Sequence, residues 1–278
     1  MPSLVETQTI HIKKTDQFAL WLSRHWLAVV NVFLGIFVIL PFLAPVFMSI
    51  GWTILGKAIY WVYSFLCHQL PERSYFLFGS KISYTLPEIQ SAWQNTDNIA
   101  FLRQFAGNSQ MGWKVGWSDR MVSMYTSLWG FGILWGVFRK KNLQLPWWGA
   151  FLMLLPMAID GTTHLISDFA GIGQGFRDSN IWLATLTNDI FATTFYTGDA
   201  WGSFNAWMRL ISGVLFGLGI IWFGLPFLDE AFTNSGQVII DKYQYRTWLR
   251  AEKTRLLNLT LIAGTGQGSN ISDRKETK

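Results

Sequence analysis

Long uncharged stretches alternate along this chain with short polar or basic segments. Four stretches contain no Asp, Glu, Lys or Arg, namely residues 26–56, 121–138, 142–159 and 210–228. A helix needs about 20 apolar residues to cross a hydrocarbon core of about 30 Å, because each residue adds about 1.5 Å. The pattern therefore predicts an all-α fold, a polytopic membrane helix bundle.

The region 51–70 leaves the number of spans open. It is apolar and aromatic but carries Lys57, so it is either a short second span with a snorkelling lysine or a helix at the membrane interface. Pro41, Pro45 and Gly51 supply breaks before it. We predict about five transmembrane helices, over residues 26–48, 51–70, 121–138, 147–166 and 209–228, with two outer loops.

Composition supports a membrane protein. Half of the residues (50%) are hydrophobic, 17% are aromatic and 14% are charged, whereas about a quarter are charged in soluble domains. The net charge is +5, but the basic residues stand beside apolar segments, at 139–141 and between 242 and 255. Such residues face anionic lipid headgroups, so we expect the lipid bilayer as a partner and no nucleic acid.

The basic residues also predict the orientation. The short loop with residues 139–141 is expected inside, which puts residues 71–120 and the acidic segment 167–208 outside, in a multi-pass protein of the cell membrane. If residues 26–70 cross twice, the N-terminus is outside, and if they cross once, it is inside. Lys13, Lys14 and Arg24 favour the inside.

The regions that flank the membrane domain are polar. We predict a polar N-terminal segment over residues 1–25, a membrane domain over 26–228 and a basic juxtamembrane helix over 229–262. Residues 263–278 are rich in Gly, Ser, Asn, Asp and Lys, and this composition predicts a disordered tail.

Ionisable groups near the spans predict a polar site. A charged side chain inside a span costs about 2.5–3.5 kcal/mol on insertion scales, so each one needs a partner or a purpose. The predicted topology places a set of ionisable residues in and near the spans on the same, outer side of the membrane. They are Cys67, His68, Arg73, Asp119, Arg120, Asp160, His164 and Arg209.

The chemistry of this site has two functional interpretations. Asp160 and His164 share a helix face and, together with His68, are candidate ligands for zinc or iron; a carboxylate and an imidazole could also relay protons. The nearby Arg73, Arg120 and Arg209 would repel a metal and instead favour an anion.

A structural interpretation applies to the same residues. Asp160 can pair with Arg120 or Arg209 to tie two helices together. His164 can be a hydrogen-bonded packing residue, and Cys67 a small buried hydrophobe. A single cysteine forms no internal disulfide.

Several motifs resemble a known family. They are Cys67-His68-Gln69 followed by Pro71-Glu72-Arg73-Ser74, Arg120 with Tyr125, Pro156 through Asp160-Gly161-Thr162-Thr163, and Arg209 with Gly213 and Gly217. Over about residues 60–228 the chain resembles an uncharacterised bacterial membrane-protein family, catalogued as domain of unknown function 2085. The resemblance adds Tyr125 and Thr163 to the candidate site. Ser118 and Met121 stand where the family has cysteines, so it implies no thiolate centre here.

The sequence leaves catalytic residues and cofactors unassigned. We expect a site that binds a small polar or anionic ligand, or a metal, for transport or membrane-embedded chemistry. The alternative is a structural or accessory subunit of a larger membrane complex, in which the charged groups tie helices together.

Overall fold

The computed structural model describes residues 12–139 and 144–272, and the side chains up to residue 261. The chain divides into two compact units, one of residues 27–227 and one of residues 1–26 with 228–278. Helix α1 (Lys14–Ser49) and helix α10 (Phe204–Ser272) contribute residues to both.

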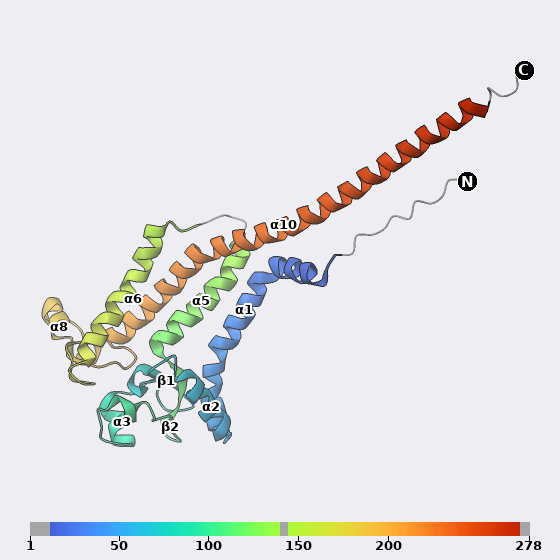
Figure 1. Cartoon of the computed structure of the whole chain (residues 1–278). Coiled ribbons are helices and arrows are strands. Elements are labelled where there is room, and N and C mark those ends of the chain that lie inside the picture. The colour runs from blue at the N-terminus through green and yellow to red at the C-terminus, as the bar shows by residue number, and fades with distance from the viewer. Residues whose placement is uncertain (1–11, 140–143, 273–278) are drawn as a thin grey trace, which may run out of the picture. The chain divides into compact units, whose positions relative to one another are not determined.

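Four helices in the described residues are long and apolar enough to cross a membrane: α1, α5 (Asp119–Phe138), α6 (Trp147–Asp168) and α10. Figure 1 shows parts of all four in the larger unit. The all-α class is therefore confirmed. Four such helices are present rather than about five.

The difference lies in residues 51–70. Helix α2 (Thr53–Tyr63) has 11 residues, about half of what a span needs. Helix α1 continues through Pro41 and Pro45 and ends at a turn where Gly51 adopts φ 86°. Residues 26–70 thus contain one helix long enough to cross, which under the positive-inside rule favours an inside N-terminus.

Small residues bring α5 and α10 close together. A Cβ atom on Gly213 would lie 2.0 Å from Ser123 Oγ, and one on Gly217 would lie 2.1 Å from Ser127 Oγ. Ser123 Oγ donates to the Arg209 carbonyl oxygen at 3.0 Å, and Ser127 Oγ to that of Gly213 at 3.2 Å. Close backbone approach and interhelical hydrogen bonds are how membrane helices associate.

A small sheet between α1 and α5 was not predicted. Strands β1 (Ser74–Leu77), β2 (Gly107–Asn108) and β3 (Gly112–Ser118) are antiparallel in the order β1-β3-β2. Two helices accompany them, α3 (Leu86–Ala92) and α4 (Ile99–Leu102). The 3₁₀-helix η1 (Pro71–Arg73) precedes β1, and Ser74 pairs with Ser118 immediately before α5. The register therefore places Arg73 beside the first turn of α5.

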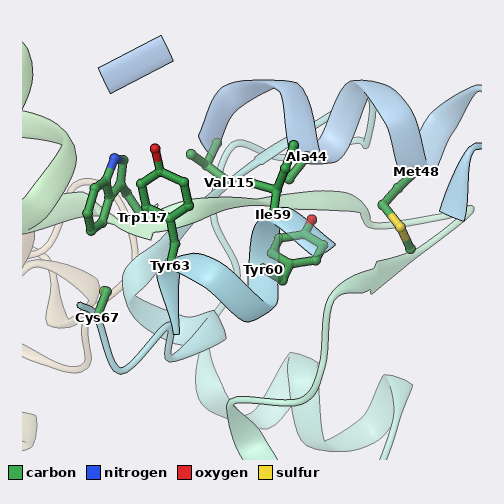
Figure 2. Close-up of a cluster of buried hydrophobic side chains, with 8 residues drawn as sticks. All are labelled: Ala44, Met48, Ile59, Tyr60, Tyr63, Cys67, Val115 and Trp117. Carbon is green, nitrogen blue, oxygen red and sulfur yellow. The ribbon is translucent and has the colours of Figure 1, made fainter. Parts of the chain in front are cut away.

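A buried hydrophobic cluster attaches this sheet to α1 (Figure 2). Its members come from α1, α2 and β3 together with Cys67; they are Ala44, Met48, Ile59, Tyr60, Tyr63, Cys67, Val115 and Trp117. Tyr63 Oη donates to the Phe37 carbonyl oxygen of α1 at 2.9 Å. Cys67 is thus buried at the edge of this cluster.

The segment between α6 and α10 contains three short helices, α7 (Phe176–Ser179), α8 (Ile181–Thr187) and α9 (Thr193–Tyr196). The buried amide of Asn180 donates to the carbonyl oxygens of Arg177 and Tyr196 at 2.6 and 2.8 Å. These hydrogen bonds fix the segment that carries Arg177 and Asp199.

The second unit is formed by the start of α1 and the later part of α10. Trp26 stacks on Phe232 with ring centroids 5.2 Å apart, and Asp16 accepts from Lys242 and Tyr243 at 2.9 and 2.7 Å. Helix α10 continues through residues 263–272, which we predicted as tail. Residues 1–11 and 273–278 lie outside the described residues, so these parts of the predicted termini stay predictions.

Candidate functional site

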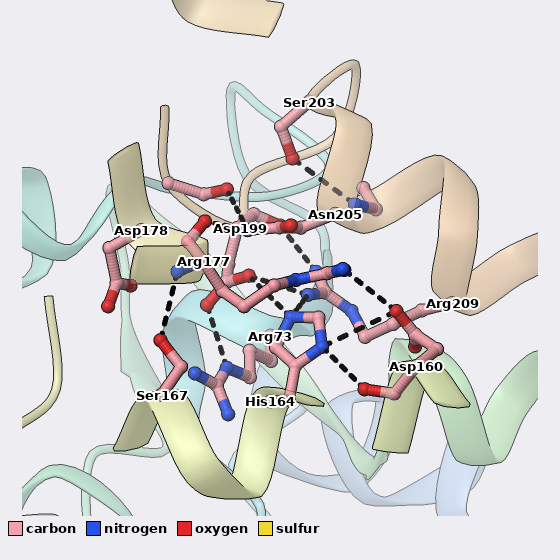
Figure 3. Close-up of polar contacts among 12 residues, drawn as sticks. Arg73, Asp160, His164, Ser167, Arg177, Asp178, Asp199, Ser203, Asn205 and Arg209 are labelled. Atoms are coloured by element: carbon pink, nitrogen blue, oxygen red, sulfur yellow. Dashed lines mark hydrogen bonds and ion pairs between the residues drawn. The ribbon is translucent and has the colours of Figure 1, made fainter. Parts of the chain in front are cut away.

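Four arginines and four aspartates form two groups of ion pairs at the ends of α5, α6 and α10 next to the sheet, as Figure 3 shows in part. The buried His164 ring lies between the groups, 3.4 Å from Asp160 and 3.6 Å from Asp199, and we call the whole set the ionic network. The network consists of Arg73, Arg120, Arg177, Arg209, Asp119, Asp160, Asp168 and Asp199. Its side chains come from η1, α5, α6, α7, α10 and the loop before α10. Equal numbers of the two charges make the network neutral as a whole.

Arg73 joins η1 to two other segments. Its Nη1 and Nη2 atoms donate to the two carboxylate oxygens of Asp168, both at 2.7 Å, and its Nε atom donates to Asp199 at 2.7 Å. Burial opposes the charge, but Asp199 and Asp168 hold the pKa of Arg73 above its ordinary value. The end of α6 is thereby tied to the sheet.

Asp199 bridges two arginines. Its Oδ1 atom accepts from Arg209 Nη1 at 2.6 Å while Oδ2 accepts from Arg73. Although burial disfavours a carboxylate, Arg73 and Arg209 hold the pKa of Asp199 well below its ordinary value. Arg209 Nε also donates to Asp119 at 2.9 and 2.8 Å, so α10 is bound to α5 as well.

Each carboxylate oxygen of Asp160 accepts a hydrogen bond from an arginine. Its Oδ2 atom accepts from Arg120 Nη2 at 2.7 Å and its Oδ1 atom from Arg177 Nη2 at 2.8 Å, and the residue is 2% exposed. This is the arrangement that the structural interpretation expected, with Arg177 in place of Arg209. A carboxylate with both oxygens so occupied is a poor proton relay.

His164 lies buried between two arginines. Its Nδ1 atom is 3.0 Å from the Asp160 carbonyl oxygen and its Nε2 atom 3.4 Å from Arg209 Nη1. A ring with Nδ1–H donating to the carbonyl leaves Nε2 as an acceptor for Arg209. His164 is thus a hydrogen-bonded packing residue in this geometry.

The proposed metal ligands do not come together. The described residues contain no group of three or more His, Cys, Asp or Glu side chains that could hold a metal ion. His68 is exposed, while Asp160 and His164 are buried among the network's arginines. The structure therefore does not assemble His68, Asp160 and His164 into a ligand set.

A cavity of about 260 Å³ lies beside the network, and we call it the arginine cavity. Its wall includes most of the predicted site residues, which are Cys67, His68, Arg73, Asp119, Arg120, His164 and Arg209. Candidate residues from the ends of separate long helices thus do converge on one cavity. Asp168 lines the cavity as well, and Leu165, Phe169 and Ile99 are its exposed apolar neighbours.

Tyr125 and Thr163 do not line the arginine cavity. The Tyr125 ring packs on Trp117 with centroids 4.9 Å apart, inside the aromatic contacts of α1, α5 and the sheet. Thr163 Oγ1 donates to the Ile159 carbonyl oxygen at 2.8 Å within its own helix. Tyr125 is thus part of helix packing, whereas Thr163 lines a separate cavity with Ile159 and Phe204.

The three arginines of the cavity wall differ in what they offer a ligand. Every guanidinium nitrogen of Arg73 and Arg209 donates to a carboxylate or carbonyl oxygen. Arg120 donates to the Asp160 side chain through Nη2, and its buried Nε atom has no acceptor in the described part of the chain. Arg120 is therefore the arginine of this wall whose guanidinium has a nitrogen atom without an acceptor in the described residues.

Sequence reasoning missed Asp168, Arg177 and Asp199. It treated the acids of residues 167–208 as a topology signal only. A usable signal was present, because the three arginines Arg73, Arg120 and Arg209 outnumber Asp119 and Asp160, the two acids at the ends of the predicted spans. Buried charges need partners, so the remaining acids had to come from that segment.

Comparison with known proteins agrees with the membrane character. A family model described as predicted membrane protein (DUF2085) matches residues 109–223. This chain is similar to that family. The matched region holds all of the network except Arg73.

One relative extends the similarity. An uncharacterized protein of Methanocaldococcus jannaschii is 29% identical over 184 residues, which is 63% of this chain and 91% of the relative. That organism is an archaeon, so a bacterial source for this chain stays a prediction. No solved structure matches the chain. The chain is a predicted membrane protein, and the comparisons bring no activity with them.

Proposed function

We propose that this protein binds the acidic head of an amphipathic molecule in the arginine cavity, with a carboxylate or phosphate as the head. The observation that carries the proposal is that Arg120 lines a cavity of about 260 Å³ while its guanidinium makes a side-chain ion pair only through Nη2 and leaves Nε without an acceptor in the described residues. An acidic oxygen there would receive charge-assisted hydrogen bonds, each worth about 1.5–3 kcal/mol.

The surrounding charges support an anion over a cation. Asp119 and Asp168 on the wall are already engaged by Arg209 and Arg73. His68 adds an exposed imidazole without a hydrogen-bond partner in the described residues. An entering anion therefore meets donors, whereas an entering cation would have to compete with arginines for each carboxylate.

Apolar side chains at the cavity support an amphipathic ligand over a free ion. Leu165 is 59% exposed and Phe169 is 81% exposed, on the last turns of α6. In a helix that crosses a membrane, such residues face acyl chains or another apolar surface. A ligand with an apolar tail would cover them while its head reaches Arg120.

Binding of short amphiphiles to the purified full chain tests this function. Octanoate and octyl phosphate carry the proposed heads, 1-octanol has the tail without the charge, and inorganic phosphate has the charge without the tail. Arg120→Lys keeps a cation for Asp160 but removes the spare Nε donor. We expect it to weaken octanoate or octyl phosphate binding about tenfold or more, the loss of one such hydrogen bond.

Arg103→Lys is the matched control, because Arg103 donates to the Ser64 carbonyl oxygen and does not line the cavity. It should leave binding unchanged. Equal binding of 1-octanol, or unchanged binding in Arg120→Lys, would contradict the proposed function.

A second candidate is the accessory subunit. Helix α8 has no buried residue, and Ile181, Leu186 and Ile190 in and after it are exposed. Such an apolar patch supports contact with another membrane subunit. Isolation in mild detergent tests it: a stoichiometric partner that is lost with Leu186→Lys favours the subunit, and a monodisperse single chain contradicts it.

A further inference from the structure

A second cavity, of about 320 Å³, lies on the other side of the Arg73–Asp199 ion pair, and we call it the acidic cavity. It is lined by Glu72, Thr85, Leu86, Pro87, Ile172, Gly173, Asp178, Thr197, Gly198 and Asp199. Three carboxylates stand on this wall, and no Lys, Arg or His does. Thr85, Pro87 and Thr197 are exposed, so the cavity opens to the surroundings.

Glu72 is the unusual residue of this wall. It is 3% exposed, and neither of its carboxylate oxygens accepts a hydrogen bond from another residue in the described part of the chain. A buried carboxylate without partners costs several kcal/mol, so native proteins rarely retain one unless something else binds it.

The nearby cations do not supply that partner. All three guanidinium nitrogens of Arg73 donate hydrogen bonds to Asp168 or Asp199. Lys114 Nζ donates to the carbonyl oxygens of Gln69 and Arg103 at 2.8 and 2.7 Å and makes no ion pair with Glu72. Glu72 is therefore a lining residue of the cavity that has no ion-pair partner among the described residues.

The other two acids of the wall have partners. Asp199 is held by Arg73 and Arg209, and Asp178 accepts from the Gly175 amide at 2.8 Å, within α7's first turn. Their charge still adds to the negative potential of the cavity. Glu72 is the carboxylate of this wall that has neither oxygen hydrogen-bonded to another residue in the described part of the chain.

We propose that the acidic cavity binds a small organic cation that carries an ammonium group, with Glu72 as its counter-ion. An ammonium offers N–H donors to both free oxygens of Glu72. The volume of about 320 Å³ reaches the range of small-molecule sites, which begins at about 300 Å³. A divalent metal fits less well, because the described residues hold no group of three acidic, His or Cys side chains able to ligate it.

The electrostatics agree with this assignment. Burial raises the pKa of Glu72 to about 7, with Arg73 and Lys114 lowering it and Asp199 raising it further. A bound ammonium would favour the ionised form and displace the proton. Affinity for a permanently charged amine should therefore rise about tenfold between pH 6 and pH 8, as the ionised fraction of a group with a pKa near 7 does.

Isothermal titration of the purified full chain with n-butylammonium tests the proposal, with n-butanol as the neutral probe and tetramethylammonium as the cation without N–H groups. We expect n-butylammonium to bind more tightly than either. Glu72→Gln should weaken it at least tenfold and flatten the pH profile. Lys114 titrates in the same pH range, since burial lowers its pKa to about 7, so the flattened profile in Glu72→Gln is what assigns the effect to Glu72.

The matched control is Glu88→Gln. Glu88 lies outside the cavity, and a glutamine can keep its capping interaction with Thr85. Leu86→Trp, which fills the cavity and keeps Glu72, decides the matter if Glu72→Gln does not fold. Binding that survives either cavity variant, or that n-butanol equals, would overturn the proposal, as would the absence of n-butylammonium binding to the natural chain. The arginine cavity plays no part in this test.

Discussion

The two cavities are built from the same ion pairs and differ in what those pairs leave over. Arg73 and Arg209 line the arginine cavity, and their partner Asp199 lines the acidic cavity. On one side the group without a partner in the described residues is Nε of Arg120, and on the other it is the carboxylate of Glu72. A neutral network of ion pairs can therefore separate a site that prefers anions from one that prefers cations. The ligand preference of each cavity is set by the side-chain atoms that the network leaves without a partner.

The largest loss of stability is expected from a change to Asp199, which belongs to the wall that the two cavities share. Asp199→Asn removes a buried charge that two arginines hold, and breaking such a pair typically costs about 3–5 kcal/mol. Thermal unfolding of the purified protein measures this. Asp189→Asn, at an exposed position of the same segment, is the control and should change little. Equal stability of the two variants would show that the cavities do not depend on a common wall.

The next largest effect is a dependence of stability on pH, and we expect it from Glu72 in the acidic cavity. The pKa of Glu72 is about 7 in the folded protein and 4.5 ordinarily, so between these values the folded state keeps a proton that the unfolded state loses. Stability should therefore fall by about 3 kcal/mol as the pH rises from 4.5 to 7.

Denaturant unfolding of the natural chain and of Glu72→Gln at several pH values checks this. The difference between them should shrink toward acidic pH and stay constant above pH 7. If the difference in stability between the two proteins does not vary with pH, Glu72 does not have the raised pKa that this prediction requires.

The smallest effect belongs to the arginine cavity. Asp168→Asn leaves Arg73 bound to Asp199, and because Asp168 is partly exposed the loss should be near the low end for such bonds, about 1.5 kcal/mol. It also frees donors on the cavity wall, so octanoate binding should become several-fold tighter. Titration with n-butylammonium should be unaffected, and a change there would show that the two sites are not separate.

The helical frame could be predicted because hydrophobicity alone encodes it. Uncharged runs mark α5 and α6, and the prediction that successive helices alternate in direction puts Arg73, Arg120 and Arg209 at one end of the bundle. The number of long helices was less secure, since the apolar run over residues 51–70 reads like a span until the turn at Gly51 and the 11-residue length of α2 are known.

The acidic half of the site could not be predicted in the same way. Asp168, Asp199 and Arg177 lie at a helix end, in a loop and in a four-residue helix, where no periodicity shows which way the chain turns. The strands were missed for a similar reason, because β2 and β1 have only two and four residues. Glu72 belongs to the motif Pro71-Glu72-Arg73-Ser74, but the sequence does not tell whether it has an ion-pair partner. That depends on which groups the nearby cations already bind, which only the three-dimensional structure reveals.

The ion pair between Arg73 and Asp199 joins residues 126 positions apart, and this distance bears on how the protein is made. A nascent chain exposes Arg73 throughout the synthesis of α5 and most of α6, until its first carboxylate partner, Asp168, emerges 95 positions later. Asp199 follows, so the pairing of Arg73 is complete only when the segment before the last helix has been made.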